Sequence, residues 1–168
     1  TEPDLITFAK AVTNGFQPLG GVLVSDKVAS VITAKGGEFA HGFTYSGHPI
    51  ACAAAMATLD IMQSDNIFQT VHDHSAPYLQ KRWAELGQHP IVGHTRGLGM
   101  FGSMELVRNK ETRERLAPDQ VSGGVCRDLS IANGLVMRAV GDSMIISPPL
   151  ICNHAEIDTI IERVTQAL

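Results

Sequence analysis

The sequence is poor in cysteine, in net positive charge and in long apolar runs, and each shortage argues against a class of protein. The three cysteines, Cys52, Cys126 and Cys152, lie far apart and form no Cys-x-x-Cys pair, which favours a reduced, cytoplasmic setting over a disulfide framework. Lys and Arg number 13 against 17 Asp and Glu, and a net charge of −4 gives no case for nucleic acid. No apolar run is long enough to cross a bilayer, and no charged-then-apolar signal peptide opens the chain. We therefore expect neither a membrane nor a nucleic acid among its partners.

Length and composition are those of a small globular protein. With 168 residues, the chain holds one domain, or one domain and a piece of another. The apolar fraction of 44% is ordinary for a globular chain, so a hydrophobic core can be buried.

A single lysine stands at the end of a short apolar run near the start of the chain. Residues 5–9 read Leu-Ile-Thr-Phe-Ala, Lys10 follows, and a loop rich in glycine and proline extends from Asn14 to Gly21. The pattern predicts a strand or extended segment that ends at Lys10. Apolar neighbours can desolvate an ammonium group, which lowers its pKa and leaves an amine able to form a Schiff base. From the spacing alone, a solvated lysine at a strand end is the ordinary alternative.

A second stretch, residues 39–49, is small, aromatic and rich in hydroxyl groups. Pro49 suits the first turn of a helix, and the apolar residues that follow predict a buried helix. The hydroxyl of Thr44 comes just before this helix and could bind a phosphate, because free N–H groups and the helix dipole lie beside it. The alternative is that Thr44 and its neighbours only cap and pack. His41 and His48 are wrongly spaced for a metal pair and lack an acid or cysteine to complete a set, so we expect no metal.

The intervening and following segments predict alternating strands and helices. Residues 21–25 are typical of a short buried strand, and Asp26 is expected to cap a helix. Residues 66–86 are helical in pattern, with Pro77 interrupting them, so two helices or a kink are expected there. Ser75 could cap the second of these helices, and Gly87 could end it.

Gly97–Gly102 spell Gly-x-Gly-x-x-Gly, but the surroundings do not fit a dinucleotide site. Such a fingerprint must follow a strand and open a helix. Here the glycines continue into a segment whose apolar residues alternate with period two, which predicts a strand. We therefore reject a Rossmann interpretation.

The last third of the chain carries an isolated arginine in an apolar strand. A charged loop at 108–119 precedes a helix at 120–133, and the apolar residues expected to face inward on that helix are Val121, Val125, Leu129 and Ala132. Residues 135–140 predict a strand, Gly141-Asp142 a tight turn, and 143–147 a returning strand. Arg138 interrupts the first of these strands. It could bind a carboxylate through its two-pronged guanidinium group, or it could reach solvent by alternation.

A closing helix has clear local signals at its start. Asn153 and Glu156 have the spacing of a capping box. The apolar face of the helix comprises Ile157, Ile160, Ile161, Val164 and Leu168.

Several of these segments together resemble the class III (fold type I) aminotransferases, which depend on pyridoxal 5′-phosphate (PLP). The ω-amino acid and amine:pyruvate transaminases are the most similar members. The lysine segment resembles the family's through Pro3, Asp4, Ala9, Lys10, Gly15, Pro18, Leu19, Gly20 and Gly21. The matching order continues through Gly42–Pro49, Arg96–Gly99 with Glu105, and Met137–Asp142.

The resemblance implies a role for each candidate residue. Lys10 is implied to hold PLP as a Schiff base and to shuttle a proton. Thr44 is implied to donate to the cofactor phosphate of the neighbouring subunit of a homodimer, and Phe43 beside it to contact the cofactor. Arg138 is implied to bind a substrate carboxylate and to swing aside for amine substrates.

The fold implied is α/β: the C-terminal part of a PLP-dependent transferase, with the upstream part absent. Residues 1–64 are expected to be the end of the large mixed-sheet, PLP-binding domain with a linking helix, and residues 65–168 a small α/β domain with an antiparallel sheet. The reaction implied moves an amino group from an amine or ω-amino acid to an oxo acid such as pyruvate. Two alternatives stay open: a PLP aminomutase of the same fold, and a folded module that cannot catalyse. For the fragment alone we expect inactivity and weak PLP binding.

Overall fold

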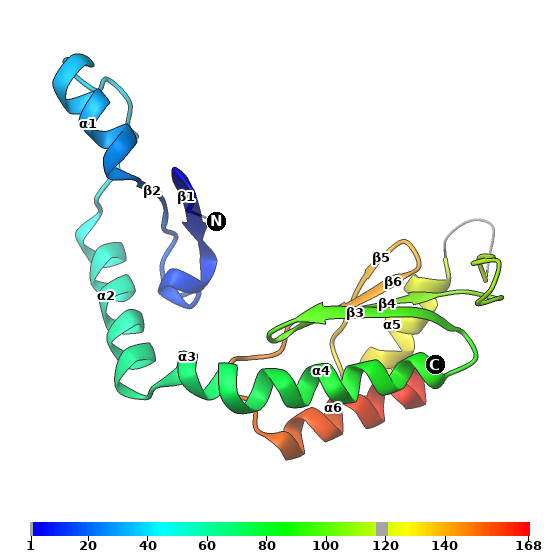
Figure 1. Cartoon of the computed structure of the whole chain (residues 1–168). Helices are drawn as coiled ribbons and strands as arrows, with labels where there is room; N and C mark the ends of the chain where they lie inside the picture. The colour runs from blue at the N-terminus through cyan, green and yellow to red at the C-terminus, as the bar shows by residue number, and fades with distance from the viewer. Residues whose placement is uncertain (1, 117–120) are drawn as a thin grey trace. The chain divides into compact units, whose positions relative to one another are not determined.

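The computed structural model describes residues 2–116 and 121–168, so part of the predicted charged loop and the predicted helix start at Gln120 lie outside the described residues. The chain divides into two compact units, Thr1–Asp65 and Asn66–Leu168. Each unit has its own strands and helices (Figure 1).

The first unit is built on a two-stranded antiparallel ribbon. Strand β1 (Leu5–Ala9) pairs with β2 (Gly20–Val24), and a 3₁₀ turn, η1 (Lys10–Thr13), opens the loop between them. Helices α1 (Asp26–Lys35) and α2 (Pro49–Ser64) follow. Pro49 is in the first turn of α2, as its missing N–H predicts. The N-cap of α1 is Ser25, one residue before the predicted Asp26.

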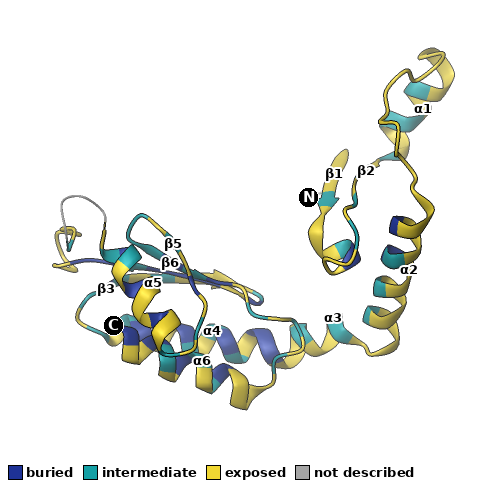
Figure 2. Ribbon diagram, turned by 180° about the vertical axis from the view of Figure 1, so that it is seen from behind, coloured by how far each residue is buried: buried dark blue, intermediate teal, exposed yellow. Residues whose placement is uncertain are grey.

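The predicted burial of β2 and α2 is wrong for the described chain. Both are apolar, but the side chains of β2 are largely exposed, and only Ala51 and Ala55 are buried in α2 (Figure 2). The reason is that, within this unit of the described chain, no further layer covers either element. Apolar composition predicts that a segment has a partner, but it does not identify that partner.

The second unit is a four-stranded antiparallel sheet with helices packed on it (Figure 1). The strand order is β3 (Val92–Leu98), β4 (Phe101–Leu106), β6 (Ser143–Ile146) and β5 (Arg138–Val140). This confirms the small antiparallel sheet expected from the sequence. The helices are α3 (Ile67–Thr70), α4 (Ala76–Glu85), α5 (Ser122–Ala132) and α6 (His154–Ala167).

The predicted break near Pro77 is a π-helical turn, η2 (Val71–Ser75), between α3 and α4. Pro77 falls in the first turn of α4, where its missing N–H has no cost. Ser75 makes no capping bond; its hydroxyl donates to the carbonyl oxygen of Cys152 at 3.1 Å instead. A short 3₁₀ turn, η3 (Leu86–Gln88), follows α4, so Gly87 lies just past the helix end.

The glycine-rich segment is a β-hairpin, as its period of two indicates, although the sequence pattern did not reveal the turn. Strands β3 and β4 pair from Leu98 and Phe101 outward, and Gly99 and Met100 form the turn. Gly99 has φ +60, a conformation that favours glycine. The glycines therefore serve a tight turn between strands.

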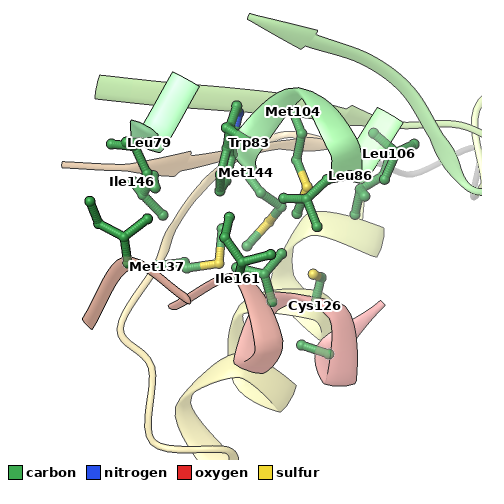
Figure 3. Packing of buried hydrophobic residues seen from close by; sticks show 14 of the residues in the cluster. Leu79, Trp83, Leu86, Met104, Leu106, Cys126, Met137, Met144, Ile146 and Ile161 are labelled. Carbon is green, nitrogen blue, oxygen red and sulfur yellow. The ribbon is translucent and has the colours of Figure 1, made fainter. Parts of the chain in front are cut away.

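The core of the second unit lies between the sheet and its helices (Figure 3). Trp83 of α4 packs against Met104 and Met144 of the central strands, and its indole N–H donates to the carbonyl oxygen of Ser103 at 3.0 Å. The largest fully buried side chains are Trp83, Leu79, Met104, Met144, Ile157, Val92 and Val164.

The inward face predicted for the helix at 120–133 is wrong. Val125 and Leu129 are 56% and 48% exposed, and the buried residues of α5 are Gly123, Cys126 and Ser130. The cause is close packing: a Cβ atom added to Gly123 would collide with the carbonyl oxygen of Gly141. Small residues on one side of α5 let the helix lie directly against the β5–β6 turn, and the larger apolar residues face outward.

Helix α6 confirms its predicted start. The Asn153 side chain accepts from the Glu156 N–H at 3.0 Å, and the Glu156 carboxylate accepts from the Asn153 N–H at 2.8 Å. This reciprocal pair is a capping box. The predicted apolar face is also confirmed, with Ile157, Ile161 and Val164 buried.

The three thiols are free, and the two in the second unit are at least partly buried. Cys52 is exposed, whereas Cys126 is buried and Cys152 is half-buried. Burial raises the pKa of the Cys126 and Cys152 thiols, which keeps them protonated at neutral pH.

In the part of the chain that the structure describes, no helix combines the length and apolar character needed to span a bilayer.

The contact between α5 and the β5–β6 turn predicts opposite effects for two adjacent glycines. Gly124→Ala should stabilise the second unit by about 0.5–1 kcal/mol, because its Cβ would meet open space in a helix. Gly123→Ala should destabilise it by about 1–3 kcal/mol, because its Cβ would displace the Gly141 carbonyl. Urea unfolding followed by the fluorescence of Trp83, the single tryptophan, measures both. Equal effects from the two substitutions would contradict the contact.

Candidate active site

Lys10 lies where β1 ends and the loop to β2 begins. It is the first residue of η1, directly after the last paired position, Ala9 opposite Gly20. Its backbone has φ +58, the left-handed region, which costs a non-glycine residue about 1–2 kcal/mol. Such conformations persist only when the surroundings fix them, and they cluster at functional sites.

A cavity of about 790 Å³ is formed by the Lys10 loop. Lys10 is among its lining residues, which come from the loop between the strands and from the last residue of β1 and the first of β2: Ala9, Lys10, Ala11, Thr13, Asn14, Gly15, Gln17, Pro18, Leu19 and Gly20. The walls are mostly apolar, with one primary amine at Lys10. A cavity of this size, with one nucleophilic group, suits a small organic molecule.

The hydroxyl of Thr13 holds this loop together. Thr13 is only 1% exposed, and its Oγ1 donates to the carbonyl oxygen of Gln17 at 2.5 Å and lies 3.4 Å from that of Lys10. Asn14, at φ 49, continues the turn. The role of Thr13 was not predicted from the sequence; a hydroxyl residue three positions after the lysine, just before Asn-Gly, is the signal that could have indicated it.

Of the two interpretations of Lys10, desolvated or solvated, the first unit alone matches the solvated one. The Lys10 side chain is exposed, and Leu5 and Ile6 of the preceding strand are also exposed. The apolar run therefore fixes where the strand ends, but in the described chain it does not bury the amine. Desolvation of this amine would therefore require a bound molecule or another segment.

Phe43 and Thr44 lie in a turn that leads toward α2. The Phe43 N–H donates to Ser46 Oγ at 3.0 Å, and the Ser46 N–H donates to the Phe43 carbonyl at 2.9 Å. Phe43 is 80% exposed and Thr44 is also exposed. Neither is among the residues that line the Lys10 cavity. Ser46 thus has the structural role in this turn, which leaves the Thr44 hydroxyl accessible.

Arg138 lies in the second unit, on the edge strand β5. It pairs with Ile145, which pairs with Ser103, which in turn pairs with Arg96. Directly opposed residues share a face of the sheet, and the core residues Met104 and Met144 occupy the other face. Arg138 is therefore on the face away from the helical core, where it is exposed.

The other cation in that row is already paired. Arg96 forms an ion pair with Glu105, whereas Arg138 has no ion pair among the described residues. Its guanidinium group can therefore bind an external carboxylate through two parallel hydrogen bonds.

Among the described residues no group of three potential metal ligands comes together, at His41 and His48 or elsewhere.

The chain belongs to the class III aminotransferases: the family model "Aminotransferase class-III" matches residues 1–168. Among curated relatives, it is 51% identical over 166 residues to the putrescine–pyruvate aminotransferase of Pseudomonas aeruginosa, covering 99% of this chain and 36% of the relative. The expected family is thereby confirmed.

Solved structures agree with this assignment. An (S)-enantioselective ω-transaminase from Thermomicrobium roseum has a TM-score of 0.92 and 38% identity, covering 99% of this chain and 37% of that one. A PMP-bound aminotransferase from Vibrio fluvialis has a TM-score of 0.90 and 29% identity, with the same coverage. The chain thus spans about a third of the length of the relatives it matches.

Thr13 provides a test of how the lysine loop is held. Thr13→Val keeps the size of the side chain but leaves the Gln17 carbonyl without its donor, so local opening should become easier by about 1–3 kcal/mol. Thr13→Ser keeps the hydroxyl and should have a smaller effect. Amide hydrogen exchange of peptides covering residues 10–20 measures the opening. Unchanged exchange in Thr13→Val would show that the hydroxyl does not hold the loop.

Proposed function

We propose that the chain is the C-terminal part of a PLP-dependent aminotransferase that moves an amino group from an amine or ω-amino acid to pyruvate. Residues 1–64 are then the end of the large cofactor-binding domain, and residues 65–168 the small domain. The observation that carries the proposal is Lys10: a primary amine on a left-handed backbone at a cavity, in a chain of this family.

The residues present fit the cofactor. Lys10 offers the amine that an aldehyde requires, and the cavity it lines has room for a small aromatic ring. Phe43 offers an exposed aromatic face, and Thr44 an exposed hydroxyl for a phosphate. When bound, PLP supplies an electron sink for bond breaking at the substrate carbon next to nitrogen.

Lys10 has two roles in this proposal, both at Nζ. Nζ would hold the cofactor covalently until the amine of the donor takes its place. Once free, Nζ would be a base able to accept and return a proton at the substrate carbon next to nitrogen. The left-handed backbone at Lys10 and the Thr13 hydrogen bond define where this side chain leaves the loop, which favours both roles. Orientation of this kind is a large part of what a protein contributes to such chemistry.

Arg138 is proposed to select the acceptor. Pyruvate carries a carboxylate next to its reacting carbonyl, and a guanidinium group binds both carboxylate oxygens with a defined geometry. A simple amine donor has no such group, so Arg138 must swing aside to admit it. The exposed position of Arg138 on an edge strand, without an ion pair among the described residues, allows both states.

The proposal includes a homodimer. Thr44 is assigned to the phosphate of the neighbouring subunit, and the exposed apolar side chains of its segment and of α2, such as Tyr45, Ile50 and Met56, favour burial against another chain. The 168-residue chain alone is then expected to be inactive and to bind PLP weakly, because one lysine and one threonine leave most of the cofactor unsupported.

Lys10→Ala tests the central assignment in the complete protein in which this chain occurs. It should abolish the absorbance band of the lysine-bound cofactor and lower transaminase turnover at least about a thousandfold. Lys35→Ala, at the exposed end of α1, is the matched control and should change neither. Retained turnover and absorbance in Lys10→Ala would refute the role. Sustained turnover without any oxo acid would contradict transamination and indicate an aminomutase.

Arg138→Leu tests the selection of the acceptor. In single-turnover half-reactions, the concentration of pyruvate needed for half-maximal rate should rise about 10- to 100-fold, the loss expected when hydrogen bonds to a charged group are removed. The half-reaction with putrescine, which has no carboxylate, should change less than about twofold. Arg127→Leu, an exposed arginine paired with Asp128, is the control. An equal loss in both half-reactions would argue against a role in binding the carboxylate.

A further inference from the structure

Arg138 lies on the short strand β5, whose position in the sheet depends on its neighbours. Strand β5 has three residues, lies at the edge of the sheet and pairs only with β6. The placement of Arg138 therefore depends on the two-residue turn, Gly141 and Asp142, that joins these strands. Gly141 has φ +58, which fits a tight turn with glycine at its first central position.

The turn is held from three sides. The Asp142 carbonyl accepts from the Leu106 N–H at 2.9 Å, which ties it to the end of β4. The Asp142 carboxylate accepts from Arg115 Nε at 3.0 Å. On the third side, the Gly141 carbonyl occupies the space that a Gly123 side chain would fill, and the Ala139 Cβ is 3.4 Å from the same point. Helix α5 therefore contacts the turn and the residue next to Arg138.

Arg115 comes from a loop that has its own hydrogen bonds. The Arg108 N–H donates to the Glu114 carbonyl at 2.7 Å, and the Arg108 guanidinium donates to the Leu116 carbonyl at 2.9 Å. The Asn109 side chain accepts from the N–H groups of Glu111 and Thr112. The loop thus presents Arg115 to the turn from a defined position.

Only one oxygen of the Asp142 carboxylate has a hydrogen-bond partner among the described residues. Its side chain is 11% exposed, and Oδ1 is buried without a hydrogen-bond partner among the described residues. A buried carboxylate oxygen without a partner costs free energy, and a tight turn does not require a carboxylate. In the described part of the chain, the one ion pair of this side chain ties the β5–β6 turn to Arg115.

We infer that Asp142, with Arg115 and Gly123, forms a clamp on the β5–β6 turn that positions Arg138 for the substrate carboxylate. The inference rests on the proposed role of Arg138. The clamp touches no substrate: it acts through the backbone of β5, which it holds at the turn and at Ala139. Misplacing a group that binds substrate by about 1 Å can cost up to about a hundredfold in rate, so a small shift of this strand has a measurable effect.

The experiment compares half-reactions of the complete, PLP-loaded protein carrying Asp142→Ala, Asp142→Asn or Arg115→Ala. For Asp142→Ala and Arg115→Ala, the pyruvate concentration for half-maximal rate should rise about tenfold. Asp142→Asn keeps an acceptor for Arg115 and should lose about threefold. The putrescine half-reaction should stay within about twofold in all three, because no carboxylate takes part.

Controls separate positioning from a general loss of structure. Glu111→Gln changes an exposed carboxylate in the same loop that has no ion pair among the described residues, and it should leave both half-reactions unchanged. Arg138→Leu/Asp142→Ala should lose no more for pyruvate than Arg138→Leu alone, because the clamp acts through Arg138. If Asp142→Ala fails to fold, the half-exposed Arg115 still tests the clamp.

The outcomes distinguish a failure of the clamp from a failure of the proposed carboxylate role of Arg138. Parallel losses in both half-reactions, or a further loss in the double variant, would overturn the clamp as a positioning device. An unchanged Asp142→Ala enzyme, in a protein where Arg138→Leu does weaken pyruvate binding, would overturn the clamp alone. An unchanged Arg138→Leu enzyme would instead contradict the proposed carboxylate role of Arg138, and the clamp with it.

Discussion

The left-handed backbone at Lys10 is the constraint on which the proposed chemistry depends. A lysine in an ordinary strand would continue the ribbon of β1 and β2, whereas φ +58 turns the chain directly after Ala9. That conformation is unfavourable by itself. It is maintained because Thr13 closes the loop onto the Gln17 carbonyl and because the paired strands fix both ends. One buried hydroxyl thus supports the residue that carries the proposed reaction.

In the second unit, the constraint is the position of Arg138. This residue lies on an exposed edge strand, so contacts with neighbouring elements must define its position. The apolar core formed by Trp83, Met104 and Met144 fixes the central strands, and these fix β5 only through pairing with β6. The remaining definition comes from polar contacts at the turn and from the close approach of α5. A packed core and an exposed edge position are therefore combined in one small sheet, which suits an arginine proposed to bind one substrate and make way for another.

The sequence predicted best those features that depend on a few neighbouring residues. The strand end at Lys10, the start of α2 at Pro49, the Asn153–Glu156 capping box and the Gly141–Asp142 turn all follow from local backbone chemistry. The order of several such motifs also indicated the family, which the match over residues 1–168 confirms.

Features set by distant contacts were not predictable in this way. The apolar face of α5 was assigned by residue type, but the close contact of Gly123 with Gly141 turns the small residues inward. The expected burial of α2, and the desolvation of Lys10 that one interpretation required, both need a covering layer that the described chain does not contain. Arg115 and Asp142 are 27 positions apart, so no local pattern could have joined them. The lesson is that local signals place the candidate residues, whereas tertiary contacts determine how firmly they are held.

The most direct test of the central claim is borohydride reduction of the complete protein with PLP, followed by mass spectrometry of its lysine-containing peptides. Reduction converts a lysine–cofactor linkage into a stable adduct. The account predicts one adduct, on the peptide that contains Lys10. An adduct on a different lysine, or none at all, would contradict it and leave Lys10 as an ordinary residue at a strand end.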